Sequence, residues 1–365
     1  MATKPTITVG VIGTGWIVRA HVYGIQTLNL LNPHPARIRV KWLYGRKETS
    51  ASAMASELGA EQWTTSWEQV VDDPEVDVIA NVSTNSLHHP VTLAALTAGK
   101  HILCEKPLAT TVAEAAEMVQ AAERAGVLAA AGFNYRYVPA VRLIRNLVDS
   151  GELGEIRHYR GLYLQDWQSN NPGWSGALGG SAVLDFSHVF DLMRHLGGEP
   201  RSVSAVATTF LGKADDAFIA AFELGGPSVG SIEASSCATG WKGRNRVEVN
   251  GTLGSAWWDM EDFSRVHVML TKDQSGGLGG FREIVVSEAE HPFMDQWWTA
   301  GHVVGWQSTF VHEWRAFLTS VARGEPLEPL QATFADGLRA GQLGAATLRS
   351  AAEGVRVACA PGAPG

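Results

Sequence analysis

Residues 7–18 read ITVGVIGTGWIV, a short β-branched run that leads directly into two closely spaced glycines, Gly13 and Gly15. The run predicts a buried strand, and the glycines predict a tight turn into a helix. The first glycine permits the turn, and the second lets the backbone approach a pyrophosphate at the helix N-terminus. Val18 stands where the full G-x-G-x-x-G pattern has its third glycine, so an ordinary strand-to-helix turn is the alternative.

The alternation of strand and helix continues from this turn to about residue 133. Further strands are predicted at residues 37–44, 76–82, 101–104 and 127–131, and helices at 51–58, 89–98 and 112–125. Strands and helices that alternate at this interval form βαβ units and a parallel sheet. We therefore predict a dinucleotide-binding α/β Rossmann domain over residues 1–135.

The second half of the chain has a different pattern. Strands are predicted at residues 156–165, 203–210, 218–224, 229–235, 246–250 and 266–270, and helices at 141–149, 187–196, 310–322 and 334–352. Many strands linked by short turns are typical of an antiparallel sheet. We therefore predict, over residues 136–365, an α+β domain with a large, mostly antiparallel open sheet.

Composition limits the classes of function. The chain has 365 residues, more than one core usually serves, and its 29 Lys+Arg against 37 Asp+Glu argue against a nucleic-acid partner. The three cysteines, Cys104, Cys237 and Cys359, are widely spaced, so we expect no disulfide framework, no metal site and a cytoplasmic location. No apolar run approaches the roughly 20 residues of a membrane helix, so we expect no membrane partner.

The end of the second predicted strand bears on cofactor choice. Residues 43–47 read LYGRK, without the carboxylate that usually binds the ribose 2′-hydroxyl of NAD. Arg46 stands where a 2′-phosphate would lie, so we expect NADP or NAD to bind, with NADP favoured. A solvated basic turn is the alternative reading.

Two further motifs follow strands, at the sheet edge where α/β proteins bind ligands. Residues 83–90 read STNSLHHP, and the next strand leads into Glu105-Lys106-Pro107. A partly desolvated lysine beside a nicotinamide suits proton transfer near neutrality. On spacing alone, a surface ion pair of Glu105 and Lys106 is the favoured explanation of this motif.

Several motifs together resemble the Gfo/Idh/MocA family of oxidoreductases. They are the glycine loop, the Asn85 to His88 segment, AGKH at 98–101, CEKPLA at 104–109, GFNYR at 132–136 and G-x-x-G-x-I at 151–156. The resemblance covers nearly the whole chain. It implies NAD(P)-dependent oxidation of a secondary hydroxyl of a sugar, anhydrosugar, glycoside or cyclitol. It also implies a homodimer or homotetramer formed through the second domain, which binds the substrate.

The resemblance assigns roles to individual residues of this chain. It implies Lys106 as proton acceptor or relay, acting with His188. Cofactor contacts are expected from Gly13, Gly15, Trp16, Ile17, Arg46, Ser83, Asn85, His88, Glu105 and Asn134. Substrate contacts are expected from Tyr135, Gln165, Trp167 and Asp185.

The second domain carries the family's glycine pair followed by Asp, His and Asp. Here it reads GGSAVLDFSHVFD at residues 179–191, with His188 three residues after Asp185 rather than the commoner four. If a helix begins near Ser187, His188 and Asp191 share one face. Asp191 then either contacts substrate or is a structural partner of His188 or Arg194.

The run YLQDW at residues 163–167 resembles the subgroup that includes levoglucosan dehydrogenase. Nine of the 13 tryptophans follow residue 150, and aromatic rings suit the apolar faces of sugars. We expect Trp167 to contact sugar, and Trp298 and Trp306 are weaker candidates. Trp257, Trp258 and Trp314 are expected in cores or interfaces. Trp16 is expected to contribute its backbone to the dinucleotide loop.

Two other functions remain open at this stage. An NAD-dependent glycosidase would oxidise a sugar transiently, eliminate the aglycone and return the hydride. A non-catalytic dinucleotide-binding regulator is the other alternative, although such relatives tend to lose the lysine that is intact here as Lys106.

Overall fold

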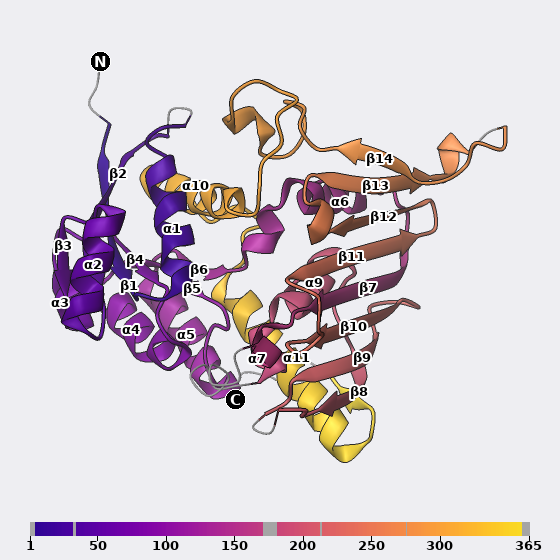
Figure 1. Cartoon of the computed structure of the whole chain (residues 1–365), viewed down its shortest axis with the longest axis horizontal. Helices are drawn as coiled ribbons and strands as arrows, with labels where there is room; N and C mark the ends of the chain where they lie inside the picture. The colour runs from indigo at the N-terminus through magenta and orange to yellow at the C-terminus, as the bar shows by residue number, and fades with distance from the viewer. Residues whose placement is uncertain (1–3, 32–33, 171–180, 212–213, 275, 360–365) are drawn as a thin grey trace. The chain divides into compact units, whose positions relative to one another are not determined.

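The computed structural model describes residues 4–31, 34–170, 181–211, 214–274 and 276–359 (Figure 1). Their contacts divide the chain into two units, one of Met1–Tyr137 with Trp306–Leu338 and one of Val138–Gly305 with Arg339–Gly365. The sequence-based boundaries, 1–135 and 136–365, placed residues 306–338 in the second domain. The structure groups this segment with the first unit instead.

The first unit is built on a six-stranded parallel sheet in the order β3-β2-β1-β4-β5-β6. Its strands are β1 (Thr6–Ile12), β2 (Arg37–Tyr44), β3 (Gln62–Thr64), β4 (Val78–Asn81), β5 (His101–Glu105) and β6 (Ala129–Gly132). Its first helices are α1 (Trp16–Thr27), α2 (Glu48–Leu58), α3 (Trp67–Asp72), α4 (Asn85–Thr97) and α5 (Val112–Ala125). The predicted Rossmann domain is confirmed, and the strand order places a switch point between β1 and β4.

Alternate strand residues build the core of this unit. Ile12, Ile79 and Ile102 are fully buried and pack with residues of α3, α4 and α5, among them Val91 and Met118. Burial of an apolar side chain of this size contributes about 1.5–3 kcal/mol. This packing fixes the strand ends from which the site residues project.

Residues 306–338 complete the first unit from far along the chain. Their helix α10 (Ser308–Arg323) lies beside α1, as Figure 1 shows. Gly24 in α1 permits the contact, because a Cβ there would lie 2.8 Å from the carbonyl carbon and oxygen of Phe310. The two helices therefore pack backbone to backbone at this point.

The second unit contains a nine-stranded sheet in the order β14-β13-β12-β11-β7-β10-β9-β8-β15. Its strands are β7 (Ile156–Leu164), β8 (Ser202–Thr208), β9 (Ala217–Glu223), β10 (Val229–Ser235), β11 (Arg244–Gly251), β12 (Gly254–Asp259), β13 (Arg265–Leu270), β14 (Arg282–Val285) and β15 (Val357–Ala358). Among the described residues of this second sheet, only β7 and β10 pair in parallel. The predicted mostly antiparallel sheet is confirmed.

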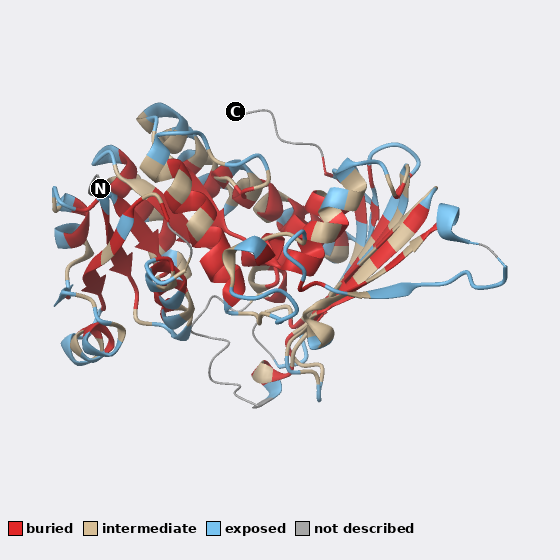
Figure 2. Ribbon diagram, turned by 90° about the horizontal axis from the view of Figure 1, so that it is seen from above, coloured by how far each residue is buried: buried red, intermediate tan, exposed pale blue. Residues whose placement is uncertain are grey.

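The two faces of this sheet differ in burial, and Figure 2 shows buried positions alternating with less buried ones along the strands. On one face Tyr159 is fully buried against Gly197, which ends α9 (His188–Leu196). Strand register places five residues side by side on the other face: Val206, Ile219, Glu233, Leu162 and Arg246. On this second face, called the open face, Val206 and Ile219 are exposed and the other three residues are partly exposed.

The remaining helices of the second unit are α6 (Pro139–Asp149), α7 (Trp167–Asn170), α8 (Ala182–Asp185) and most of α11 (Phe334–Glu353). In the described part of the chain, every helix is too short or too polar to cross a membrane.

We predict that alanine substitutions at two helical glycines change the stability of the protein in opposite directions. Gly24→Ala should destabilise the protein by about 1–3 kcal/mol, because the new methyl overpacks the contact with Phe310. Gly341→Ala in α11 meets no atom within 4 Å and should stabilise it by roughly 0.5–1 kcal/mol through helix propensity. Urea unfolding of the two variants measures both changes. Equal effects in the two helices would contradict a tight α1–α10 contact.

Candidate functional site

The glycine loop lies at the switch point of the first sheet. Gly13 has a φ of 137°, and a Cβ there would lie 2.4 Å from the carbonyl oxygen of Val82, just after β4. Its N–H donates to the carbonyl oxygen of Tyr44 at 3.0 Å. Gly13 thus brings the ends of β1, β2 and β4 together, a position that no residue with a side chain could take without strain.

Gly15 has a different surrounding. It is the N-cap of α1, and a Cβ built on it meets no atom within 4 Å. The first turn of α1 has no acidic residue to repel an anion, so backbone N–H groups at this helix N-terminus can donate to one. This open space at a helix N-terminus fits the pyrophosphate of a dinucleotide.

Trp16 and Ile17 follow in the first turn of α1. Trp16 is 60% exposed, and its ring stacks on that of Trp306, with centroids 6.0 Å apart and planes at 26°. The indole of Trp16, and not only its backbone, therefore takes part in the architecture of the loop. Trp306 was a weak candidate for sugar contact, but its described contacts are with Trp16 and Phe310 of the first unit.

Arg46 lies at the end of β2, exposed to solvent, as does Lys47. The intervening Gly45 is buried, and a Cβ there would lie 2.5 Å from Cγ2 of Thr14 in the glycine loop. The close approach puts the basic pair next to the loop that would hold the dinucleotide. No carboxylate occupies residues 43–47.

The loop after β4 is held by local hydrogen bonds. The hydroxyl of Ser83 donates to Oδ1 of Asn81 at 2.7 Å, and the half-buried Asn85 begins α4. His88 is buried, with Nδ1 2.8 Å from the carbonyl oxygen of Pro107. Burial lowers the pKa of His88 despite that hydrogen bond and the nearby Glu105. A neutral His88 therefore ties the loop to the Glu-Lys-Pro turn.

Glu105 is a buried carboxylate at the end of β5, and Lys106 next to it is half-buried. Oε2 of Glu105 accepts the backbone N–H of Lys106 at 2.8 Å, and Oε1 of Glu105 lies 2.9 Å from Nε2 of His21. Burial opposes ionisation, but the hydrogen bond and electrostatic interaction with His21, followed by the charge and backbone N–H of Lys106, outweigh it and hold the pKa of Glu105 below its usual value. Glu105 is thus a buried group and not a surface carboxylate.

The segment after β6 carries Asn134 and Tyr135, both buried in a short 3₁₀ turn, η1 (Asn134–Tyr137). The amide nitrogen of Asn134 donates to the hydroxyl of Thr309 at 2.9 Å. Sequence reasoning found Asn134 but not Thr309 or His21. Thr309 lies 175 residues from its partner, and no local pattern indicates the pairing.

In the second unit, two of the predicted substrate residues, Gln165 and Trp167, follow the end of β7. The indole nitrogen of Trp167 donates to Oε1 of Gln165 at 2.7 Å, and Nε2 of Gln165 lies 3.4 Å from the hydroxyl of Tyr163. The ring of Tyr163 lies 6.5 Å from that of His188. Gln165, Trp167 and His188 therefore gather around Tyr163.

Helix α9 begins at His188, as the spacing predicted, and Asp191 lies one turn further on. Both side chains are buried. Asp185 ends α8 and is half-buried, while the glycine pair Gly179-Gly180 lies outside the described residues. Asp191 keeps both of its possible roles.

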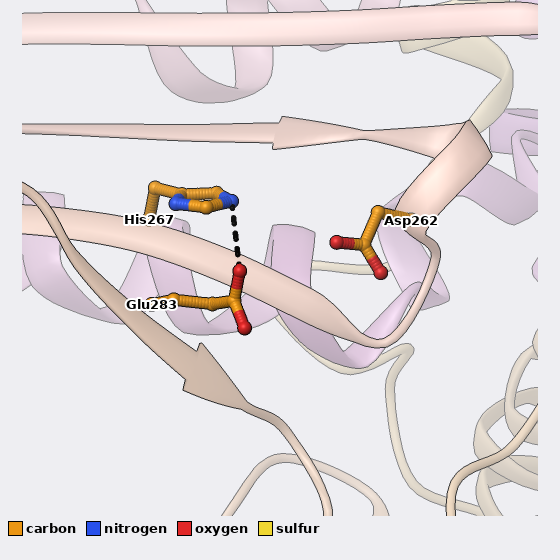
Figure 3. Close-up of side chains that lie close together, drawn as sticks. All are labelled: Asp262, His267 and Glu283. Carbon is orange, nitrogen blue, oxygen red and sulfur yellow. Dashed lines mark ion pairs between the residues drawn. The ribbon is translucent and has the colours of Figure 1, made fainter.

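One group of side chains has the composition of a metal site. Figure 3 shows Asp262, His267 and Glu283, whose ligand atoms all lie within 4.8 Å of one another. Arg265 lies 2.8 Å from Oδ1 of Asp262 and 2.8 Å from Oε1 of Glu283. Because the guanidinium of Arg265 pairs with both carboxylates, these side chains form an ion-pair network.

Family models match both halves of the chain. A model described as "Oxidoreductase family, NAD-binding Rossmann fold" matches residues 7–133. One described as "GFO/IDH/MocA C-terminal domain" matches residues 141–257.

Individual relatives are dehydrogenases of sugars and cyclitols. Levoglucosan dehydrogenase of Pseudarthrobacter phenanthrenivorans is 31% identical, over 95% of this chain and 96% of the relative. D-xylose dehydrogenase of Paenarthrobacter nicotinovorans is 30% identical, over 77% of this chain and 78% of the relative. A solved structure of levoglucosan dehydrogenase in complex with NADH and levoglucosan superposes with a TM-score of 0.92 at 30% identity, covering 98% of this chain and 100% of that one.

The two loop glycines predict separable effects. Gly15→Ala should leave the Tm of the protein without cofactor unchanged, yet weaken NADH binding at least about tenfold, because the methyl occupies the open space beside the helix N-terminus. Gly13→Ala should lower the Tm itself, since it combines a clash with Val82 and a positive φ. Thermal unfolding and NADH fluorescence titration measure both. Wild-type NADH affinity in Gly15→Ala would contradict a pyrophosphate site beside Gly15.

Proposed function

The chain belongs to the GFO/IDH/MocA oxidoreductase family, and from that premise we propose that it oxidises a secondary hydroxyl of a sugar, anhydrosugar, glycoside or cyclitol. It is an NAD-binding enzyme with a Rossmann fold. A bound nicotinamide dinucleotide supplies the hydride acceptor. The similarity to levoglucosan dehydrogenase over 95% of the chain supports a carbohydrate substrate.

The observation that carries the proposal is the placement of Lys106. It follows β5, a neighbour of β4 in the sheet, and the loop after β4 approaches the glycine loop at Val82. Its backbone is fixed by the buried Glu105, and its side chain is only half-buried. A lysine held in this way can accept a hydroxyl proton as hydride leaves the same carbon.

We assign the remaining roles by side-chain chemistry. Lys106 accepts or relays the proton, with His188 as its partner. Tyr135, Gln165, Trp167 and Asp185 hold the sugar. The bond from Trp167 to Gln165 fixes the indole and the amide relative to each other, which suits a ring with one apolar face and several hydroxyls. Ser83, Asn85, His88, Glu105 and Asn134 line the nicotinamide riboside.

We propose that both dinucleotides are accepted and that NADP is favoured. The exposed Arg46 beside the glycine loop can bind a 2′-phosphate, and residues 43–47 hold no carboxylate that would repel it. Related levoglucosan dehydrogenase structures hold NADH.

The enzyme would act as a homodimer or homotetramer in the cytoplasm. Its three cysteines are unpaired, in keeping with a reducing compartment. The open face of the second sheet exposes Val206 and Ile219 next to each other, and a partner copy would remove this apolar surface from water. Light scattering of the purified chain would give the number of copies, and a monomer would contradict this assignment.

The proposal is tested by a panel of about twenty sugars and cyclitols, led by levoglucosan, with NAD and NADP, followed at 340 nm. Reduced cofactor that accumulates in proportion to oxidised sugar is the expected result. Release of an aglycone without net reduction would assign the chain as a glycosidase instead. Dinucleotide binding without turnover of any substrate would favour a regulator.

Replacing the proposed base should separate chemistry from binding. Lys106→Ala should lower kcat by about 10²–10⁴-fold and leave NADH affinity within about twofold of wild type, because only proton transfer is lost. Lys272→Ala, which removes an exposed lysine paired with Glu152, is the matched control and should keep full activity. Near wild-type kcat in Lys106→Ala would remove this residue from the mechanism.

The basic pair after β2 gives a prediction for cofactor choice. Arg46→Ala should lower kcat/KM for NADP by about 10–100-fold and leave that for NAD nearly unchanged, because charged hydrogen bonds contribute roughly 1.5–3 kcal/mol. Steady-state kinetics with both cofactors measures the ratio. A wild-type preference for NAD of tenfold or more would contradict the role of Arg46.

A further inference from the structure

A chain of three buried side chains leads from α10 to the proposed base, and no pattern in the sequence indicated it. Its first member is Trp314, its second is His21 in α1, and its third is Glu105. Trp314 and His21 are fully buried, and Glu105 is nearly so. This series of hydrogen bonds ends at Lys106, whose backbone N–H donates to the carboxylate of Glu105.

The first link fixes the protonation of His21. The indole nitrogen of Trp314 lies 3.0 Å from Nδ1 of His21, and an indole N–H can only donate. Nδ1 must therefore offer a lone pair, and the single proton of a neutral imidazole must sit on Nε2. A doubly protonated ring would point an N–H at the N–H of Trp314.

The second link uses that proton. Nε2 of His21 lies 2.9 Å from Oε1 of Glu105, so the Nε2–H donates to the carboxylate. The opposite tautomer would place a lone pair against a negative oxygen. Trp314 thus selects the one neutral form of His21 that binds Glu105.

The imidazole is also held by its neighbours. The rings of Phe310 and Trp314 meet it edge to face, with centroids at 4.8 Å and 6.0 Å. Gly132 leaves the room that Glu105 occupies, since a Cβ there would lie 3.2 Å from Oε1. Glu105 therefore has one well-defined position.

We propose that Trp314 and His21 are positioning residues, which act through Glu105 to hold the backbone of Lys106 where its side chain reaches the substrate hydroxyl. The inference rests on the proposed function, because it takes Lys106 as the base. A displacement of about 1 Å at a reacting group can cost roughly 100-fold in rate. Loss of either link should accordingly lower kcat more than it changes the sugar KM.

Trp314→Phe is the principal test, because it removes the N–H and keeps most of the ring. The matched control is Trp258→Phe in the second unit, another fully buried indole, whose N–H donates to the carbonyl oxygen of Phe263 at 2.8 Å. Both variants should lose similar thermal stability. Only Trp314→Phe should lower kcat for levoglucosan, by at least about tenfold, with KM within about twofold.

Substitutions of His21 distinguish positioning from packing. His21→Gln keeps an amide N–H that can donate to Glu105, whereas His21→Leu fills similar space without a donor. The glutamine variant should therefore retain at least about tenfold more activity than the leucine variant. Equal activity of the two would overturn the proposal.

The tautomer itself is measured without any substrate. In protein labelled with ¹⁵N-histidine, the long-range NMR correlations of His21, assigned by difference with His21→Gln, should show a protonated Nε2 and a bare Nδ1. Trp314→Phe should abolish this pure pattern. A protonated Nδ1 in the wild type would overturn the inference even if the enzyme oxidises sugars. If no sugar is oxidised, the proposed function is contradicted. The NMR measurement of the His21 tautomer still tests the inference in that case, because it needs no substrate.

Discussion

Burial of the Glu105 carboxylate is the constraint on which the first unit depends. An ionised group inside a protein is costly unless its oxygens are hydrogen-bonded. The partners of Glu105 come from separate elements: a backbone N–H at the end of β5 and an imidazole from α1, with space made by a glycine at the end of β6. A single charge therefore fixes how these elements meet at one edge of the sheet.

The same edge is shaped by close backbone approach. Gly13 meets the carbonyl oxygen of Val82, and Gly45 meets Thr14, so the loops after β1, β2 and β4 touch one another. Parallel strands bring their carboxyl ends to one edge, and the switch between β1 and β4 opens a space there. Glycine is required at the first of these positions for its conformation and at both for their lack of a side chain.

Much of the fold could be predicted from the sequence because burial repeats along it. The strands β1 and β2 and the helix α5 follow from apolar periodicity and from glycines after their last residues, and β10 follows from apolar periodicity. The three-residue β3 and the six-residue α3 are too short to show a period, and they went unpredicted. β12 and β14 were also missed, since glycine and tryptophan in the first and charge in the second mask the alternation.

The residues of the candidate site also fall into two groups, those that a local sequence pattern indicates and those that it does not. Residues that follow strands, such as Ser83, Lys106 and Gln165, could be proposed as site residues because a strand end is visible in the sequence. His21, Thr309 and Trp314 could not, since their partners lie 84, 175 and 293 residues away. The second half of the sequence holds an excess of tryptophan, but two of these residues belong to the first unit. Trp306 and Trp314 both lie in residues 306–338, which the structure groups with that unit.

The first unit is completed by residues 306–338, which come late in the sequence. Its sheet ends at Gly132, but the groups that satisfy His21 and Asn134 are supplied only after more than 170 further residues. Contacts of such separation form late, because loop-closure entropy opposes them until the intervening chain is ordered. The strands and the glycine loop can therefore assemble from local βαβ units. The hydrogen bond from Trp314 to His21, and with it the full set of contacts around Glu105, forms only when α10 packs on α1.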